Sequence, residues 1–214
     1  MATQGPGGLQ LFEAGNGGIL GLCDLQTPGD PSQWVAALPE TDRAYIASIA
    51  HPANALRSAV ARWAARQVAA AAGLAYRGIG RTPGGRPWLE GSTASVSLSH
   101  SGLYAAALIN PGAPCGVDLE QIKPKAATLA PKFLSSQELS AYRPGPEAAT
   151  LFWSIKEAAY KRLGLKGPTL RGHLAVLALD TDQGTALVEN TYPGGEPLLP
   201  VAFAQLPGAW LAWS

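Results

Sequence analysis

Two acidic residues, Asp118 and Glu120, lie two positions apart in the segment 115–120, Cys-Gly-Val-Asp-Leu-Glu. If this segment is a strand, alternate side chains share one face, so both carboxylates point the same way. Adjacent carboxylates repel each other unless a divalent cation or water relieves the repulsion, and oxygen ligands suit Mg²⁺ or Mn²⁺. Taken alone, the segment fits either a metal site or a solvated strand edge.

A third acid, Glu157, lies four residues before Lys161 in the segment 150–163, whose apolar spacing predicts a helix. Trp153, Glu157 and Lys161 share one stripe of this helix, away from its apolar face. One interpretation is a Glu–Lys pair on the helix surface. The other is a third metal carboxylate placed one turn from an ammonium that binds phosphate.

Ser99 and His100 lie where a predicted strand ends beside a turn at Ser101 and Gly102. Neighbouring Ser and His residues rarely reach each other as a catalytic pair does, and the chain has no G-x-S-x-G elbow. A histidine and hydroxyls at a strand end are better placed to donate hydrogen bonds to a phosphate. A structural turn histidine is the alternative.

Charged residues make up 14% of the 214-residue chain, and the net charge is +1, whereas an average domain has about 25% charged residues. Without a run of Lys or Arg, binding of nucleic acid or anionic membrane by bulk electrostatics is excluded. The apolar runs are shorter than the roughly 20 residues that span a bilayer, and an export signal is missing. We expect a cytoplasmic protein that binds anions through local residues.

The cysteines and histidines give no sign of a zinc site. Cys23 and Cys115 are expected to be free, buried thiols, since disulfides are rare in a chain without an export signal. His51, His100 and His173 are scattered and have none of the spacings that zinc sites use.

Helical and strand patterns occur in both halves of the chain and predict an α+β fold. Helices are expected at residues 34–38, 41–49, 52–72, 132–142 and 150–163, with Thr41 or Asp42 capping the second. Strands are expected at residues 9–13, 19–25, 95–99, 104–110, 116–120, 173–179, 185–190, 199–206 and 209–213. Residues 81–87 form a turn-rich stretch. We predict two α+β subdomains of similar size, residues 1–110 and 111–214.

Three motifs occur in an order and spacing that resemble a known enzyme family. They are Ser97-Leu98-Ser99-His100-Ser101, Gly116-Val117-Asp118-Leu119-Glu120, and Trp153-Ser154-Ile155-Lys156-Glu157-Ala158-Ala159-Tyr160-Lys161. The chain here resembles the Sfp-type 4′-phosphopantetheinyl transferases, whose motifs read roughly S-x-S-H-S, G-[VI]-D-[LIV]-E and W-[ST]-x-K-E-[AS]-x-x-K. Gly85-Arg86-Pro87 resembles the G-K-P of that family, and the resemblance covers about residues 50–167.

The resemblance implies a monomer of two similar α+β subdomains with pseudo-twofold symmetry, and coenzyme A bound in the cleft between them. It implies Mg²⁺, with Mn²⁺ as the alternative, on Asp118, Glu120 and Glu157 at the pyrophosphate. The implied reaction transfers 4′-phosphopantetheine from coenzyme A to a serine of an apo acyl, peptidyl or aryl carrier protein and releases 3′,5′-ADP. The serine belongs to the carrier, which would explain the absence of a nucleophile motif here.

The resemblance also implies roles for individual residues. Glu157, directly or through a metal-bound water, would accept the serine proton, and Asp118 and Lys161 would complete the catalytic group. Lys161, Lys156 and His100 would surround the pyrophosphate with positive charge or hydrogen bonds. The expected coenzyme-binding residues are Arg43, Arg57, Ser58, Arg86, Ser99, His100, Lys156 and Lys161.

The chain departs from the family pattern at two places. Arg86 replaces the usual lysine of G-K-P, and arginine binds phosphate through a planar fork. Family members generally carry several basic residues ahead of the first long helix to hold the 3′-phosphate, but residues 41–51 contain only Arg43. The 3′-phosphate site is therefore open, with Arg57, Ser58 and Arg86 as further candidates.

Two other functions are compatible with these residues. One is a module that binds carrier proteins on the same fold with little catalysis. The other is a Mg²⁺-dependent phosphohydrolase, although a P-loop and a two-metal acid cluster are both missing. The carrier itself, from fatty-acid, polyketide or nonribosomal peptide synthesis, is not indicated. We expect it to dock on residues 121–131 and the helix 132–142, where Phe133 lies.

Overall fold

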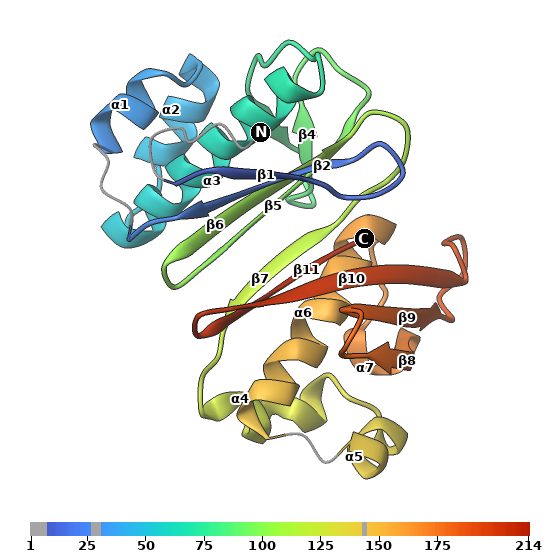
Figure 1. The fold of residues 1–214 in the computed structure, drawn as a ribbon. Coiled ribbons are helices and arrows are strands. Elements are labelled where there is room, and N and C mark those ends of the chain that lie inside the picture. The colour runs from blue at the N-terminus through green and yellow to red at the C-terminus, as the bar shows by residue number, and fades with distance from the viewer. Residues whose placement is uncertain (1–7, 27–30, 143–144) are drawn as a thin grey trace. The chain divides into compact units, whose positions relative to one another are not determined.

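The structure, a computed structural model, describes residues 8–26, 31–142 and 145–214. The chain divides into two compact units, which we call unit 1, ending at Cys115, and unit 2, beginning at Gly116. The sequence suggested a division after residue 110. Each unit combines helices with antiparallel strands, so the α+β fold class predicted from the sequence is confirmed (Figure 1).

In unit 1 the described strands form one antiparallel sheet in the order β1-β2-β6-β5 and a separate hairpin, β3-β4. The strands are β1 (Gln10–Glu13), β2 (Ile19–Asp24), β3 (Ile79–Arg81), β4 (Pro87–Leu89), β5 (Ser95–Ser101) and β6 (Tyr104–Asn110). The helices are α1 (Pro31–Ala36), α2 (Glu40–Ala47) and α3 (Pro52–Ala71). The hairpin encloses the turn-rich stretch 81–87.

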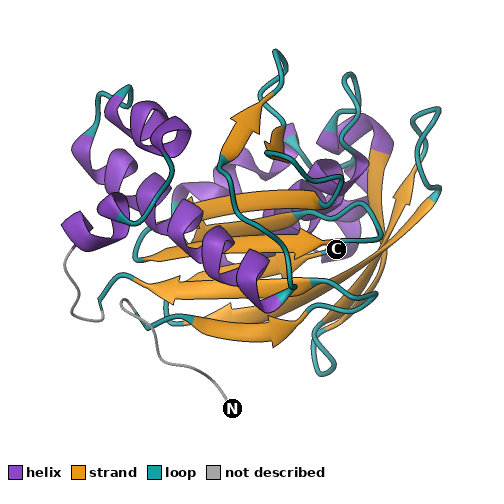
Figure 2. Cartoon of the chain, turned by 90° about the horizontal axis from the view of Figure 1, so that it is seen from above, coloured by secondary structure: helices purple, strands orange, loops and turns teal. Residues whose placement is uncertain are grey.

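The long helix α3 is the centre of unit 1. It begins with Pro52 in its first turn, where the missing N–H costs nothing, and Gly73 follows its end with φ +70°. One face of α3 packs on β2, β5 and β6, and α1 and α2 pack against it (Figures 1 and 2). Trp63 and Val68 are buried in the resulting core, as the predicted apolar stripe requires.

In unit 2 the described strands form one antiparallel sheet in the order β7-β11-β10-β9-β8. The strands are β7 (Val117–Gln121), β8 (Leu174–Asp180), β9 (Thr185–Asn190), β10 (Leu198–Leu206) and β11 (Ala209–Trp213). The helices are α4 (Lys125–Leu129), the 3₁₀ turn η1 (Ala130–Lys132), α5 (Ser136–Tyr142), α6 (Pro146–Leu163) and α7 (Leu170–His173). Helix α6 packs on all five of these strands (Figure 1).

Several elements differ from the sequence-based expectation. The helix expected at 132–142 is interrupted, because Ser135 and Glu138 form a capping box that starts α5: the Glu138 N–H donates to Ser135 Oγ (3.2 Å) and the Ser135 N–H to Glu138 Oε2 (2.7 Å). The segment 121–131, expected as a loop, contains α4. Asp42 caps no helix; α2 begins at Glu40, and Asp42 is buried.

The prediction about the two cysteines can also be compared with the structure. Cys23 and Cys115 are both free and buried, as predicted. Burial raises the pKa of the Cys23 thiol to about 12, so this thiol is unreactive at neutral pH. Across the described residues, we find no helix with the length and apolarity that crossing a membrane requires.

Candidate functional site

Asp118 and Glu120 lie on β7 and are held by its antiparallel pairing with β11, where Asp118 is opposite Ala212 and Glu120 opposite Trp210. Being two residues apart, they share one side of the strand, as predicted. Asp118 is only 6% exposed. The interpretation as a solvated strand edge therefore does not fit Asp118. Glu120 is more exposed than Asp118 and is half-buried.

Lys161 on α6 connects the helix to this strand. Its ammonium donates to Asp118 Oδ1 at 2.8 Å and to the backbone oxygen of Val117 at 2.9 Å. A Glu–Lys pair confined to the helix surface would not make these contacts. Lys161 therefore fixes the position of the Asp118 carboxylate, and 28% of the Lys161 side chain remains exposed.

Glu157 lies one turn before Lys161 on the same helix. Burial raises the pKa of Glu157, and the negative charges of Asp118 and Glu120 raise it further, while Lys161 opposes the shift. These charges act on Glu157 only because they lie near it. The structure thus brings Asp118, Glu120, Glu157 and Lys161 together into one group, which we call the acidic cluster.

Glycine at position 116 allows β7 and α6 to approach this closely. A Cβ atom at Gly116 would lie 2.0 Å from the backbone oxygen of Ala158 and 2.6 Å from the backbone nitrogen of Arg162. Real Cβ atoms do not approach backbone atoms so closely. Asp118 follows Gly116 by two residues, so this glycine allows the start of the strand that carries Asp118 to lie close to the helix that carries Glu157.

The donor chemistry of the acidic cluster fits Mg²⁺. This ion takes oxygen ligands, commonly one or two carboxylates together with water and substrate phosphates. The carboxylates do not form a preformed cage. In the part of the chain that the structure describes, no group of three or more Asp, Glu, His or Cys side chains is placed so that it could hold an ion. One oxygen of Asp118 accepts from Lys161 instead.

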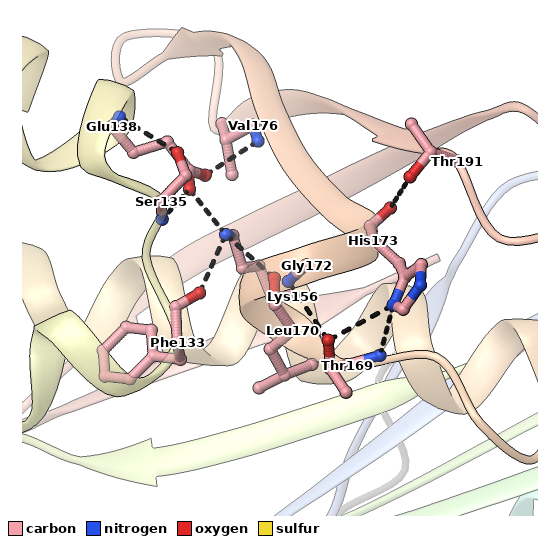
Figure 3. Close-up of polar contacts among 10 residues, drawn as sticks. All are labelled: Phe133, Ser135, Glu138, Lys156, Thr169, Leu170, Gly172, His173, Val176 and Thr191. Atoms are coloured by element: carbon pink, nitrogen blue, oxygen red, sulfur yellow. Dashed lines mark hydrogen bonds and ion pairs between the residues drawn. The ribbon is translucent and has the colours of Figure 1, made fainter.

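Lys156 does not belong to the acidic cluster, and its expected contact with pyrophosphate is contradicted. Its side chain has no exposed surface, and its ammonium donates to Glu138 Oε2 (2.8 Å) and to the backbone oxygens of Phe133 (3.0 Å) and Leu170 (3.2 Å) (Figure 3). An ammonium has three donors, and all three are used. The lysine of the W-S-x-K-E motif therefore has a structural role here.

The sequence-predicted residues of unit 1 lie in different places. Ser58, Ser99 and His100 line one pocket of about 380 Å³, which we call the arginine pocket because Arg62 and Arg81 also line it. Neither arginine was among the residues predicted from the sequence. Arg62 falls among the polar positions of a helical pattern, and no local signal indicates that Tyr45 of α2 covers it.

The other predicted cations of unit 1 lie outside the lining of the arginine pocket. Arg43 pairs with Glu40 within α2 and donates to the backbone oxygen of Leu38 at 3.1 Å. Arg57 donates to the backbone oxygen of Gly102 at 2.9 Å and to Asn54 Oδ1 at 3.1 Å. Arg86 is exposed and lines a different pocket of about 600 Å³ with Thr82 and Trp88.

The segment that carries the acidic cluster matches known proteins in sequence. Residues 114–199 match the family model of the 4′-phosphopantetheinyl transferase superfamily. A similar protein is the 4′-phosphopantetheinyl transferase of Bacillus subtilis, which is 29% identical over 151 residues. The aligned part spans 66% of this chain and 66% of that relative, slightly less than two thirds of its length. The family match includes β7 and α6, the two elements that carry the acidic cluster.

Proposed function

We propose that this protein is a Mg²⁺-dependent 4′-phosphopantetheinyl transferase that moves phosphopantetheine from coenzyme A to a serine of an apo carrier protein. The observation that carries the proposal is the acidic cluster, in which Asp118, Glu120, Glu157 and Lys161 lie together within the segment that matches the superfamily. The Sfp type, the pseudo-twofold relation of the subdomains, the monomeric state and the cytoplasmic location stay predictions.

The proposed chemistry is a displacement at the phosphorus that carries the pantetheine arm. The serine oxygen of the carrier forms a bond to this phosphorus, the bond to the bridging pyrophosphate oxygen breaks, and 3′,5′-ADP leaves with that oxygen. Asp118, Glu120 and Glu157 are the proposed carboxylates for Mg²⁺; because they do not form a preformed site, water and the substrate phosphates would complete its ligands, and the ion would neutralise the pyrophosphate oxygens. The serine proton would pass to the Glu157 carboxylate, either directly or through a metal-bound water.

Lys161 supports this step in two ways. Its hydrogen bond holds the Asp118 carboxylate in place, and its positive charge, on a partly exposed side chain, would attract the leaving phosphate. A rigid contact between helix and strand suits this role, because catalytic groups must be fixed before the reaction begins. The coenzyme-binding residues proposed for unit 1 are Ser58, Ser99, His100, Arg57 and Arg86.

A pocket of unit 2 supports the proposed docking of a carrier. It has a volume of about 260 Å³, and its lining includes Glu120, Lys123, Lys125, Phe133 and Trp153. Phe133 is only 3% exposed and contacts Trp153 edge to face, so it forms the floor and not the rim. We propose that the exposed Lys123 and Lys125 meet the acidic surface that carrier proteins generally have, next to Glu120.

The proposal is tested by incubating purified apo carrier proteins with this protein, coenzyme A and Mg²⁺ and measuring the carrier mass. We expect a gain of one phosphopantetheine on the acceptor serine, which chelation of Mg²⁺ abolishes. Carriers from fatty-acid, polyketide and nonribosomal peptide synthesis are tested in parallel, since the carrier class is open.

The same experiment separates the two rival functions. A carrier that binds tightly in a pull-down but keeps its mass would support a carrier-binding module. Release of 3′,5′-ADP at the same rate with and without carrier would support a phosphohydrolase. Either result would overturn the proposed transfer.

A further inference from the structure

The pocket of unit 2 beside Glu120, which we call the docking pocket, has one wall that is not anchored by its own side chains. Its lining includes Glu120 of β7, Lys125 of α4, Phe133, and Trp153 of α6. None of the residues of α4, all of which the structure describes, is buried. Since a short helix is held in place mainly by its buried apolar face, the position of this wall depends on the segment that follows α4.

Phe133 attaches that segment to α6 at two points. Its ring is 3% exposed and contacts the ring of Trp153 edge to face, with the ring centres 5.0 Å apart. Its backbone oxygen accepts a hydrogen bond from the Lys156 ammonium at 3.0 Å (Figure 3). Trp153 and Lys156 both belong to α6, so the floor of the docking pocket is fixed to the helix that also carries Glu157.

The Lys156 ammonium is itself held from several sides. It also donates to Glu138 Oε2 at 2.8 Å and to the backbone oxygen of Leu170 at 3.2 Å. The Glu138 carboxylate accepts from the N–H groups of Ser135, at 2.7 Å, and Val176, at 3.0 Å (Figure 3). The pair therefore joins the segment after α4 to α6, α7 and β8 through one network of directional bonds.

Stability alone is a poor explanation for the Lys156–Glu138 pair. Removing two charges from water costs free energy that their attraction does not always offset, and apolar side chains of similar size are often equally stable in their place. Hydrogen bonds prefer defined lengths and directions, whereas apolar contacts are not directional. Such a pair suits a place where the exact position of a backbone segment matters.

We propose that Lys156 and Glu138 are positioning residues for carrier recognition, because they hold Phe133 and the wall formed by α4 in the place that a carrier protein requires. The inference rests on the proposed function and on the docking of the carrier at this pocket. Without the pair, the docking pocket would have to become ordered as the carrier binds, which weakens binding. The acidic cluster would keep its geometry, since Lys161 and Gly116 determine it.

The test replaces both members of the pair, so that no unpaired charge remains. The probe is the apo carrier protein that wild type binds best among the fatty-acid, polyketide and nonribosomal peptide classes. Calorimetry without coenzyme A should show that Lys156→Met/Glu138→Leu binds this carrier about tenfold more weakly than wild type. In steady-state transfer, the KM for the carrier should rise to the same extent, while kcat and the KM for coenzyme A change by less than about twofold.

The matched control is Arg162→Met/Glu196→Leu. It removes another ion pair of α6, with 2.7 Å between Arg162 Nη2 and Glu196 Oε2, and neither residue lines the docking pocket. This variant should bind the carrier as wild type does. Thermal unfolding verifies that both double variants are folded.

A second variant covers the case in which Lys156→Met/Glu138→Leu does not fold. Glu138→Gln keeps the shape of the side chain but replaces one accepting oxygen by a donor. It should weaken carrier binding at least about threefold through the loss of one hydrogen bond in the network.

The outcomes separate this inference from the proposed function. Unchanged carrier affinity in the folded variants would overturn the inference and leave the proposed transferase intact. A lower kcat with unchanged carrier affinity would also overturn it, because the pair would then act on the acidic cluster. If wild type binds the carrier without modifying it and the variants bind it more weakly, the transferase is refuted and the positioning role stands.

Discussion

The environment of Glu157 differs from that of an ordinary surface glutamate. It is half-buried, and the carboxylates of Asp118 and Glu120 lie near it. Its raised pKa means that ionisation costs more in the folded protein than in the unfolded chain. In the absence of a bound cation, the acidic cluster therefore reduces the stability of the fold in order to hold negative charge at one place.

This cost predicts a pH-dependent effect of Glu157→Gln on stability. Because the folded pKa of Glu157 lies above the unfolded value of 4.5, the folded state binds more protons, and wild-type stability falls as pH rises from 4.5 through the folded pKa. Without Mg²⁺, Glu157→Gln should be more stable than wild type at pH 7 and lose that advantage near pH 4. Urea unfolding at several pH values measures this.

Glu189→Gln is the matched control, since Glu189 is a glutamate of unit 2 outside the acidic cluster. It should show no comparable gain at pH 7. A Glu157→Gln variant that is less stable than wild type at pH 7 would show that the carboxylate is favourably bound in the absence of metal, contrary to this account.

The two pairs that make up the acidic cluster could be predicted at the residue scale because the members of each pair are close in sequence. The spacing of Asp118 and Glu120 on a strand, and of Glu157 and Lys161 on a helix, already places each pair on one face. Lys156 could not be placed correctly, since its burial depends on contacts with Glu138 and the backbone of Leu170. Those partners are 18 and 14 residues away along the chain.

At the scale of elements, the close contact between β7 and α6 determines the geometry of the acidic cluster. Lys161 spans the two elements, and Gly116 allows them to approach. Gly116→Ala should destabilise the protein by about 2 kcal/mol or more, because its Cβ would overlap backbone atoms that cannot rotate away. Gly112→Ala, whose Cβ would meet nothing within 4 Å, should change stability by less than about 0.5 kcal/mol.

Chemical denaturation of the two glycine variants provides the comparison. We expect Gly116→Ala to reduce phosphopantetheine transfer as well, since a shift of α6 moves Glu157 relative to Asp118. Equal stability of the two variants would contradict the close packing of β7 on α6.

A buried ion pair connects four elements of unit 2. Glu138 on α5 accepts from Lys156 on α6 and from the Val176 N–H on β8, and Lys156 donates to Leu170 on α7 (Figure 3). Removing one partner of such a pair leaves an uncompensated buried charge. Lys156→Met should therefore cost about 3–5 kcal/mol of unfolding free energy, whereas Lys166→Met, at an exposed lysine, should cost little.

The pH dependence of this pair has a defined sign. Burial by itself would raise the pKa of Glu138, but hydrogen bonds from Lys156, Val176 and Ser135 outweigh it and lower the pKa. The pair's contribution is therefore present above the unfolded value of 4.5 and is lost as pH falls through the folded pKa. A wild-type advantage over Lys156→Met that stays constant down to pH 2 would contradict this assignment.

Most elements in which apolar residues recur at a regular spacing were predicted from the sequence. Short elements without such a pattern were not. The strands Thr185–Asn190 and Ala209–Trp213 have the predicted bounds, and α3 ends within one residue of its prediction. The β3–β4 hairpin was missed because its strands are only three residues long and flank turn signals. The pairing of β7 with β11 depends on contacts between distant segments, which sequence spacing alone does not determine.

At the scale of the whole molecule, the scarcity of charge makes the few buried charges informative. With a net charge of +1, the protein has little long-range attraction for anions. Charges with little exposure occur in the acidic cluster, in the Lys156–Glu138 pair and at Arg62 of the arginine pocket. The acidic cluster would carry the proposed reaction, and the Lys156–Glu138 pair supports the fold of unit 2.

The most direct test of the proposed phosphopantetheine transfer is the mass of an apo carrier protein after incubation with coenzyme A, Mg²⁺ and either wild type or Glu157→Gln. We expect wild type to add one phosphopantetheine to the carrier. For Glu157→Gln, whose fold is verified by its thermal unfolding, we expect a rate at least about 100-fold lower, as for the loss of a general base. An unmodified carrier with wild type, or equal rates for the two proteins, would contradict the proposed transfer with Glu157 as the base.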